Sequence, residues 1–316
     1  MSAKKSVVID LKFERREIGA ALAGAFSGRA VLHASDSGLD ISDARYAIVW
    51  KPDPNIFQRA PKLEVLFSGG AGVDHILSMP GLPDIPIVRF VDESLTNRMS
   101  EWVVLQALSH LRQVPAYLGQ QRERRWRELS QPEAGDITVG VMGLGVLGLD
   151  SVRKLGIMGF NVVGWSRSGK TIEGVETFDG GELDAFLART DILVGLLPLT
   201  SDTRGIFNAA LFGKLRQGGA LGKPVFINAG RGGSQVDADL VGALESGVLG
   251  GASLDVFETE PLPADSPYWA LENVFVTPHA ASASDVRALF RNAEVQMTRY
   301  EAGQPLEHVV DVKAGY

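Results

Sequence analysis

Residues 137–148 read Ile-Thr-Val-Gly-Val-Met-Gly-Leu-Gly-Val-Leu-Gly, an apolar strand pattern that runs into the glycine pattern G-x-G-x-x-G. A helical pattern follows to Met158, Gly159 stands where that helix would end, and a second strand pattern begins at Asn161. In this setting the three glycines permit a tight turn, close approach of a pyrophosphate, and close packing of helix on strand. The helix N-terminus then offers unpaired N–H groups to phosphate. The stretch predicts a dinucleotide-binding unit, the alternative being a glycine-rich turn without a ligand, and the expected contacts are Gly143, Gly145, Val146, Leu147 and Gly148.

The residues after the next strand favour NADPH over NADH. Domains that bind NAD place an acid about 20 residues after the glycines, where it accepts a hydrogen bond from the ribose 2′-hydroxyl. Here residues 164–170 read Gly-Trp-Ser-Arg-Ser-Gly-Lys, and the first acid is Glu173. Arg167 offers a planar cationic fork that suits a 2′-phosphate. We expect the phosphate to be bound by Ser166, Arg167, Ser168 and Lys170, the alternative being that the two cations belong to a solvated loop end.

Strand patterns on both sides of this unit indicate two parallel sheets. Patterns at 137–142, 161–165, 191–197, 225–228, 251–256 and 274–277, separated by helix-compatible segments, fit a doubly wound nucleotide-binding domain. Earlier patterns at 7–9, 47–50, 63–67 and 87–90, with a helix at 18–26, predict a second βαβ series. Helices are also expected at about 100–118 and 283–302. The last segment is too short for a core of its own, so we predict domains at 1–99 plus 284–316 and at 100–283.

Length and composition agree with this organisation. The chain has 316 residues, about right for two domains, with 45% hydrophobic and 22% charged residues. A formal charge of −7 argues against a basic nucleic-acid surface. The absence of cysteine excludes disulfides, thiolate nucleophiles and cysteine-bound metals. No apolar run approaches the about 20 residues of a membrane span, and the start has no signal-length apolar stretch, so we expect a cytoplasmic protein without membrane or nucleic-acid partners.

Three later segments place polar residues beyond strand ends, where doubly wound sheets bind ligands. They read Asn-Ala-Gly-Arg-Gly-Gly at 228–233, Asp-Val-Phe-Glu-Thr-Glu-Pro-Leu-Pro at 255–263 and Thr-Pro-His at 277–279. With the glycine motif, these segments resemble the D-2-hydroxyacid dehydrogenase family over essentially the whole chain. Residues 165–168, 260–263, 266–269 and 315–316 are similar to its bacterial NADPH-dependent glyoxylate/hydroxypyruvate reductases. A longer stretch at 218–224 departs from the pattern, and we interpret it as a surface insertion that leaves Arg231 in place.

The resemblance implies an α/β fold with two doubly wound parallel-sheet domains. One is a flavodoxin-like substrate domain, the other a Rossmann cofactor domain, and the active site lies in the cleft between them. The family's catalytic Arg, Glu and His correspond to Arg231, Glu260 and His279. Reduction of a 2-oxo acid needs a cation for the carboxylate, which Arg231 supplies, and a proton donor for the developing alkoxide, which suits His279 because an imidazole titrates near neutral pH. Glu260 would orient the imidazole and favour its charged form.

Structural alternatives stay open for each residue: an ion pair of Arg231 with Asp237, a turn role for Glu260, and a loop role for His279. The family also implies a nicotinamide-carboxamide contact for Asp255 and a backbone nest for the substrate carboxylate at Gly70, Ala71 and Gly72. Trp50 either walls the substrate pocket or belongs to the core. Further cofactor contacts are expected from Leu197, Pro198, Ala229 and Gly230. The remaining histidines are interpreted as structural, with His75 as the strongest candidate for an exception, and no His and acid spacing suggests a metal.

These patterns predict NADPH-dependent reduction of small 2-oxo acids, glyoxylate and hydroxypyruvate, to the 2-hydroxy acids glycolate and glycerate. Two alternatives remain: a dehydrogenase of another 2-hydroxy acid, and a nucleotide-sensing, corepressor-like interaction protein. The family implies a homodimer built largely from the cofactor domain. The arginine-rich segment 122–127 is read as a solvated face or loop, or as a subunit contact because it contains Trp126.

Overall fold

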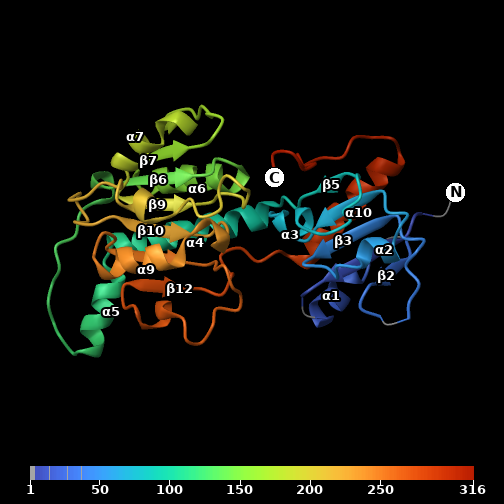
Figure 1. Cartoon of the computed structure of the whole chain (residues 1–316), viewed down its shortest axis with the longest axis horizontal. Helices are drawn as coiled ribbons and strands as arrows, with labels where there is room; N and C mark the ends of the chain where they lie inside the picture. Colours follow the sequence, from blue (N-terminus) through green and yellow to red (C-terminus); the bar gives the residue numbers. More distant parts are fainter. Residues whose placement is uncertain (1–3, 14, 27, 37) are drawn as a thin grey trace. The chain divides into compact units, whose positions relative to one another are not determined.

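The structure is a computed structural model that describes residues 4–13, 15–26, 28–36 and 38–316, so the expected start of the first domain, Met1–Ala3, lies outside the described residues. The chain divides into two compact units (Figure 1). Unit 1 combines Met1–Leu95 with Ser284–Tyr316, and unit 2 is Thr96–Ala283.

Unit 1 is built on a five-stranded parallel sheet in the order β2-β1-β3-β4-β5. This is the flavodoxin-like order. The central strands are buried on both faces, which explains why their sequences are nearly continuous apolar runs, interrupted by the buried Asp10, rather than alternating ones. The strands are β1 (Val7–Leu11), β2 (Val31–His33), β3 (Tyr46–Trp50), β4 (Val65–Ser68) and β5 (Ile87–Val88). The helices are α1 (Arg15–Leu22), α2 (Ile56–Arg59), α3 (Asp74–Leu77) and α10 (Val286–Glu301).

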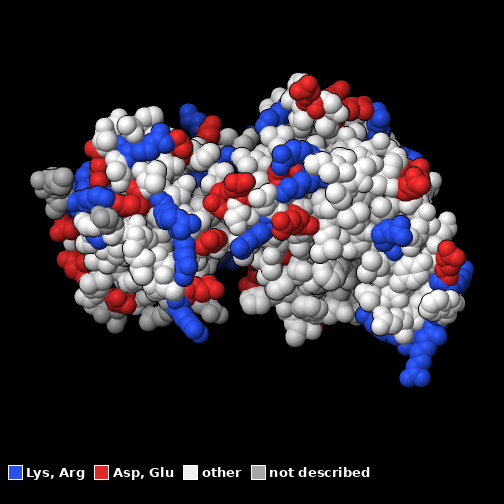
Figure 2. Space-filling view, turned by 180° about the vertical axis from the view of Figure 1, so that it is seen from behind, with Lys and Arg blue, Asp and Glu red and all other residues white. Residues whose placement is uncertain are grey.

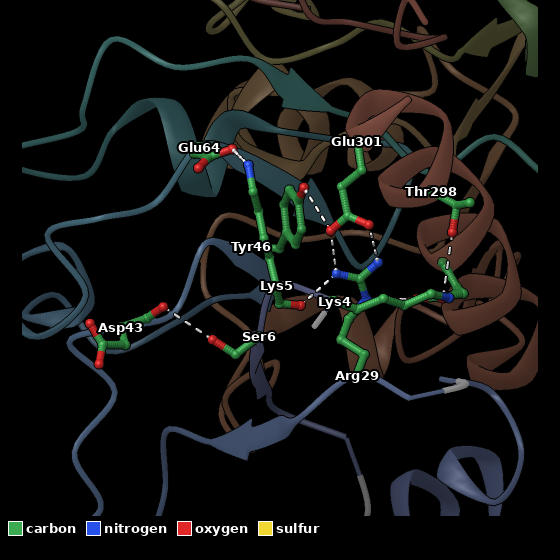
Figure 3. Close-up of polar contacts among 10 residues, drawn as sticks. Lys4, Lys5, Ser6, Arg29, Asp43, Tyr46, Glu64, Thr298 and Glu301 are labelled. Atoms are coloured by element: carbon green, nitrogen blue, oxygen red, sulfur yellow. Dashed lines mark hydrogen bonds and ion pairs between the residues drawn. The ribbon is translucent and has the colours of Figure 1, made fainter. Parts of the chain in front are cut away.

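A buried arginine fastens the C-terminal helix α10 to the rest of unit 1 (Figure 3). The side chain of Arg29 has no exposed surface, and its guanidinium lies 2.8 Å from carboxylate oxygens of both Glu294 and Glu301. Tyr46 donates its hydroxyl to Glu301 at 3.2 Å. Burial is the largest single influence and would raise the pKa of Glu301, but the hydrogen bonds and charge of Arg29, with the hydrogen bonds from Lys5 and Tyr46, together hold that pKa below its usual value. The segment after residue 283 is therefore bound into the first unit by charge as well as by packing.

Unit 2 is built on a seven-stranded parallel sheet in the order β12-β11-β10-β9-β6-β7-β8. Counted from β6, this is the Rossmann order 3-2-1-4-5-6 with a seventh strand added at the far edge. The predicted fold class, two doubly wound parallel sheets in an α/β protein, is confirmed. The strands are β6 (Thr138–Met142), β7 (Asn161–Trp165), β8 (Glu176–Phe178), β9 (Ile192–Gly195), β10 (Val225–Asn228), β11 (Gly251–Leu254) and β12 (Val274–Val276).

Six α-helices are described between residues 93 and 245, most of them within unit 2. They are α4 (Glu93–Leu111), α5 (Val114–Arg122), α6 (Val146–Ile157), α7 (Leu183–Ala188), α8 (Ala209–Phe212) and α9 (Asp237–Glu245). Four short 3₁₀ turns add η1 (Ala134–Asp136), η2 (Gly180–Glu182), η3 (Gly232–Ser234) and η4 (Pro267–Ala270). No helix among the described residues is both long enough and apolar enough to cross a membrane.

The single helix predicted at about 100–118 is wrong. The chain forms α4 and α5 instead, because Gln113 adopts a left-handed backbone (φ 55°) and Pro115 follows in the first turn of α5. The helix predicted at 18–26 ends at Leu22, since the chain turns at Gly24 with φ 79°. The edge strands β2 and β8 were missed because each has only three residues.

The arginine-rich segment and the stretch at 218–224 were both expected at the surface, and both are largely exposed. Residues 121–128 are exposed, and Trp126 is fully exposed (102%). Residues 218–224 form a mostly exposed turn in which the amide of Gly218 donates to the carbonyl of Gly222, and β10 begins directly after it. Figure 2 shows basic and acidic side chains interspersed over the face in view, rather than gathered by sign.

Candidate active site

The glycine loop after β6 has the geometry that a dinucleotide needs. Gly143 has φ 105°, and a Cβ there would lie 2.5 Å from the carbonyl oxygen of Leu196. A Cβ on Gly148 would lie 1.8 Å from the carbonyl oxygen of Gly143, so this position must be glycine for α6 to pack on its strand. A Cβ on Gly145, the N-cap of α6, would meet no atom within 4 Å. Open space at the helix N-terminus is where a pyrophosphate approaches the backbone, so the residues fit the cofactor.

The predicted 2′-phosphate residues lie in the turn after β7. Arg167 is half-exposed, and its Nη1 lies 2.6 Å from Oδ2 of Asp202, which is in the loop after β9. Lys170 donates from Nζ to the carbonyl of Leu144 at 3.1 Å, so it contacts the glycine loop itself. Ser168 is exposed. Ser166 Oγ is buried without a hydrogen-bond partner in the described part of the chain, so it faces the fold in this structure.

Hydrogen bonds within the loop after β10 position Arg231. Asn228 accepts from the amide of Gly230 at 3.0 Å and donates to the carbonyl of Arg231 at 3.3 Å. The Arg231 guanidinium donates to the Gly230 carbonyl at 2.8 Å. A Cβ on Gly230 would lie 2.8 Å from the carbonyl oxygen of Leu197. The loop containing Ala229 and Gly230 therefore lies against the Leu197–Pro198 loop after β9.

Asp237, the structural alternative as partner for Arg231, accepts hydrogen bonds from other residues. Gln235 donates to it at 3.0 Å and the Tyr268 hydroxyl at 2.8 Å. The Asp237 carboxylate is therefore hydrogen-bonded to Gln235, directly after η3, and to Tyr268 in η4.

Glu260 and His279 are in direct contact. His279 Nδ1 lies 3.1 and 3.0 Å from the two carboxylate oxygens of Glu260. A carboxylate only accepts, so Nδ1 carries the proton in the neutral form of the ring, whose lone pair is then at Nε2. Glu260 also accepts from the amide of Phe257 at 3.2 Å, and its peptide bond to Pro261 is cis.

Asp255 holds the backbone of the His279 loop. It is 1% exposed, and Oδ1 accepts from the Thr277 hydroxyl at 2.6 Å and from the amides of Ala280 and Ala281 at 2.7 and 3.0 Å. The Asp255 carbonyl accepts from the His279 amide at 2.8 Å. These bonds hold His279 in a left-handed conformation (φ 54°) that a non-glycine residue rarely adopts. The predicted nicotinamide contact of Asp255 stays a prediction, and sequence reasoning did not foresee its use as an anchor.

The predicted substrate residues of unit 1 lie together at the ends of β3 and β4. A Cβ on Gly70 would lie 2.6 Å from Cζ3 of Trp50, so the indole ring covers this glycine. The Gly70 amide donates to Ser68 Oγ at 3.3 Å, and the same hydroxyl donates to the carbonyl of Gly72 at 3.0 Å. Ala71 and Gly72 are partly exposed. The edge of the Trp50 ring also meets the ring of His75, with centroids 4.4 Å apart.

Comparison with known proteins identifies the family. Residues 104–281 match the family model for the D-isomer specific 2-hydroxyacid dehydrogenase NAD-binding domain. The chain belongs to the D-isomer specific 2-hydroxyacid dehydrogenases. This dehydrogenase is similar to glyoxylate/hydroxypyruvate reductase A of Serratia proteamaculans, with 40% identity over 284 residues that cover 88% of this chain and 89% of the relative. The predicted family resemblance is confirmed.

Solved structures of relatives extend the comparison. An NADPH-dependent glyoxylate/hydroxypyruvate reductase from Sinorhizobium meliloti, in complex with NADP and sulfate, is 64% identical with a TM-score of 0.97, covering 99% of this chain and 100% of its own. A probable 2-hydroxyacid dehydrogenase from Rhizobium etli, in complex with NADP, HEPES and L(+)-tartaric acid, is 60% identical with a TM-score of 0.94 and the same coverage. Among the described residues of this dehydrogenase, no group of three or more His, Asp or Glu side chains is placed to hold a metal ion.

Proposed function

We propose that this dehydrogenase reduces small 2-oxo acids, glyoxylate and hydroxypyruvate, to glycolate and glycerate with NADPH. The observation that carries the proposal is the Glu260–His279 contact at 3.0 Å, which leaves Nε2 of the imidazole for proton exchange. The glyoxylate/hydroxypyruvate reductases among the relatives supply the substrate class. The NADP complexes at 60–64% identity supply the cofactor.

Three side chains divide the chemistry. Arg231 binds the substrate carboxylate with its guanidinium. His279 donates a proton from Nε2 to the oxygen of the carbonyl group as that oxygen gains charge. Glu260 holds Nδ1, orients the ring and stabilises the imidazolium. When bound, NADPH supplies the hydride.

Unit 2 is the proposed cofactor domain and unit 1 the proposed substrate domain. The loop after β6 would hold the pyrophosphate with the backbone of residues 143–148. Arg167, Ser168 and Lys170, with Ser166 after a rotamer change, would hold the 2′-phosphate. Leu197, Pro198, Ala229, Gly230 and Asp255 would line the nicotinamide end. In unit 1, Gly70, Ala71 and Gly72 would bind the substrate carboxylate beside Trp50.

We also propose a cytoplasmic homodimer that forms through unit 2. Apolar side chains are exposed on α4, α5 and the segment after α5, namely Leu105, Val114, Leu118 and Trp126. We expect the interface between the two subunits to bury these side chains. Light scattering of the purified protein tests the dimer, and Trp126→Ala should weaken it. Cell fractionation tests the location.

A turnover assay tests the catalytic proposal. NADPH or NADH is offered with glyoxylate, hydroxypyruvate, other 2-oxo acids, and aldehydes that lack a carboxylate. We expect glyoxylate and hydroxypyruvate to be preferred, with kcat/KM at least about tenfold higher for NADPH, because one charge-assisted hydrogen bond contributes about 1.5–3 kcal/mol. Equal reduction of the aldehydes would contradict the role of Arg231, and a preference for NADH would contradict the cofactor assignment.

A further inference from the structure

An ion pair in unit 2 joins two loops on either side of the glycine motif. In the sheet, β6 lies between β7 and β9, and the parallel strands end at one edge. The glycine motif follows β6, Arg167 follows β7, and Asp202 belongs to the loop after β9. The 2.6 Å contact between Arg167 Nη1 and Asp202 Oδ2 therefore connects the strands on both sides of β6, at the edge where doubly wound sheets bind ligands.

Hydrogen bonds hold the backbone around both residues of this ion pair. The Arg167 carbonyl accepts from the amide of Gly180 at 3.3 Å, which fixes the turn after β7 on the segment that follows β8. On the other side, Thr203 Oγ1 donates to the Pro198 carbonyl at 2.6 Å and accepts from the Thr200 amide at 2.8 Å. These bonds enclose Asp202 in a closed turn, so its carboxylate is presented to the guanidinium from a defined position.

We propose that Asp202 is a specificity-determining residue that opposes the 2′-phosphate of NADPH at Arg167. The inference rests on the proposed role of Arg167 in binding that phosphate. A phosphate that approaches Arg167 must share the guanidinium with the carboxylate and meets its negative charge. NADH lacks the phosphate and meets neither cost. Asp202 therefore lowers affinity for NADPH more than affinity for NADH, and moderates the preference that Arg167 and Lys170 create.

The size of the effect follows from the exposure of the pair. The side chains of Arg167 and Asp202 are 52% and 63% exposed. Exposed ion pairs of this kind contribute modestly and are screened by salt. Removing the carboxylate charge should tighten NADPH binding by about two- to fivefold at low ionic strength.

The test measures dissociation constants of NADPH and NADH by nicotinamide fluorescence, without substrate, for the wild type, Asp202→Asn and Arg167→Ala. Asp184→Asn is the matched control, because Asp184 forms an equally short, exposed ion pair with Lys214 at 2.6 Å elsewhere in unit 2. We expect Asp202→Asn to tighten NADPH selectively, the gain to shrink at about 1 M salt, where the screening length is about 3 Å, and Asp184→Asn to change neither constant.

The outcomes separate the two proposals. Unchanged NADPH binding in Arg167→Ala would overturn the assignment of the phosphate to Arg167, and this inference with it. If Arg167→Ala loses NADPH affinity, the phosphate assignment stands, and unchanged or weaker NADPH binding in Asp202→Asn would overturn only the role proposed for Asp202. Weaker binding would mean that Asp202 positions the Arg167 guanidinium for the phosphate. If Asp202→Asn tightened NADPH and NADH equally, or if Asp184→Asn tightened NADPH as much, the change in net charge of the protein would explain the tighter binding. Either result would also overturn the role proposed for Asp202.

Discussion

His110 should make the stability of unit 2 fall on mild acidification. It lies in the last turn of α4, with the ring buried, and its Nε2 is 2.9 Å from Ser253 Oγ in β11. Ser253 donates its own hydrogen to Gln106 at 3.0 Å, so it accepts from His110 and the proton of the neutral ring resides on Nε2. Burial lowers the pKa of His110 from 6.5 to about 4, because the charged ring would lose its hydration.

The sign and size follow from proton linkage. The unfolded chain binds a proton at His110 near pH 6.5, whereas the folded protein binds it only near pH 4. The contribution of the neutral His110 ring to the free energy of unfolding is therefore fully present above about pH 6.5 and is lost as the pH falls from about 6.5 to about 4. Each pH unit costs about 1.4 kcal/mol, so the free energy of unfolding should drop by about 2 kcal/mol at pH 5 and by about 3 kcal/mol at pH 4.

Urea unfolding between pH 7.5 and 4.5, followed by circular dichroism, measures the effect for the wild type and His110→Gln. Glutamine retains a donor toward Ser253 but does not titrate, so the stability difference between the two proteins should shrink as pH falls. His308→Gln, at an exposed position, should follow the wild type. Parallel profiles of wild type and His110→Gln would refute the argument that burial keeps this ring neutral.

Three further predictions concern catalysis, the cofactor loop and the fold of unit 1. His279→Gln should lower kcat for glyoxylate reduction by about 10²–10⁴-fold, with the dissociation constant of NADPH within about twofold, and a variant with near-normal turnover would remove His279 from the mechanism. Gly145→Ala should weaken NADPH binding in titrations and leave the melting temperature almost unchanged. Gly148→Ala should lower the melting temperature, because its Cβ would lie 1.8 Å from a carbonyl oxygen. A lower melting temperature in Gly145→Ala and an unchanged one in Gly148→Ala would contradict the roles given to the two glycines. Arg29→Met should lower the free energy of unfolding in urea by about 3 kcal/mol, the low end for a broken buried ion pair, because the Glu301 side chain is 20% exposed. A decrease of less than about 1 kcal/mol would mean that packing alone holds α10 in unit 1.

The sequence predicted the features whose chemistry is local. The glycine loop, the turn after β7 and the three polar strand ends are contiguous patterns, and each is found at the carboxyl edge of the Rossmann sheet. Asp202 was missed because its contact with Arg167 spans 35 residues and depends on the order of β9, β6 and β7. The anchoring bonds of Asp255 were missed for a related reason, since they are made across neighbouring strand ends to residues 277–281.

The break between α4 and α5 shows a different limit. The sequence predicts one helix across residue 113, but a single left-handed residue followed by Pro115 ends one helix and begins another. Periodicity reports which face is apolar and not where the hydrogen bonds stop. The edge strands β2 and β8 were missed because three residues are too few for a period to register.

The discontinuity of unit 1 determines the order in which the protein can fold on the ribosome. Unit 2 is complete once residue 283 has emerged, but unit 1 needs α10, which is synthesised after all of unit 2. Until then Arg29 is made without Glu294 and Glu301, the two carboxylates that neutralise it in the finished protein. A nascent chain should therefore present a finished unit 2 beside an open first sheet, which is the form that chaperones and proteases meet. Translation that stops before residue 286 would release a product that holds nucleotide but lacks α10, and limited proteolysis of such fragments would cut before residue 96 and spare the rest.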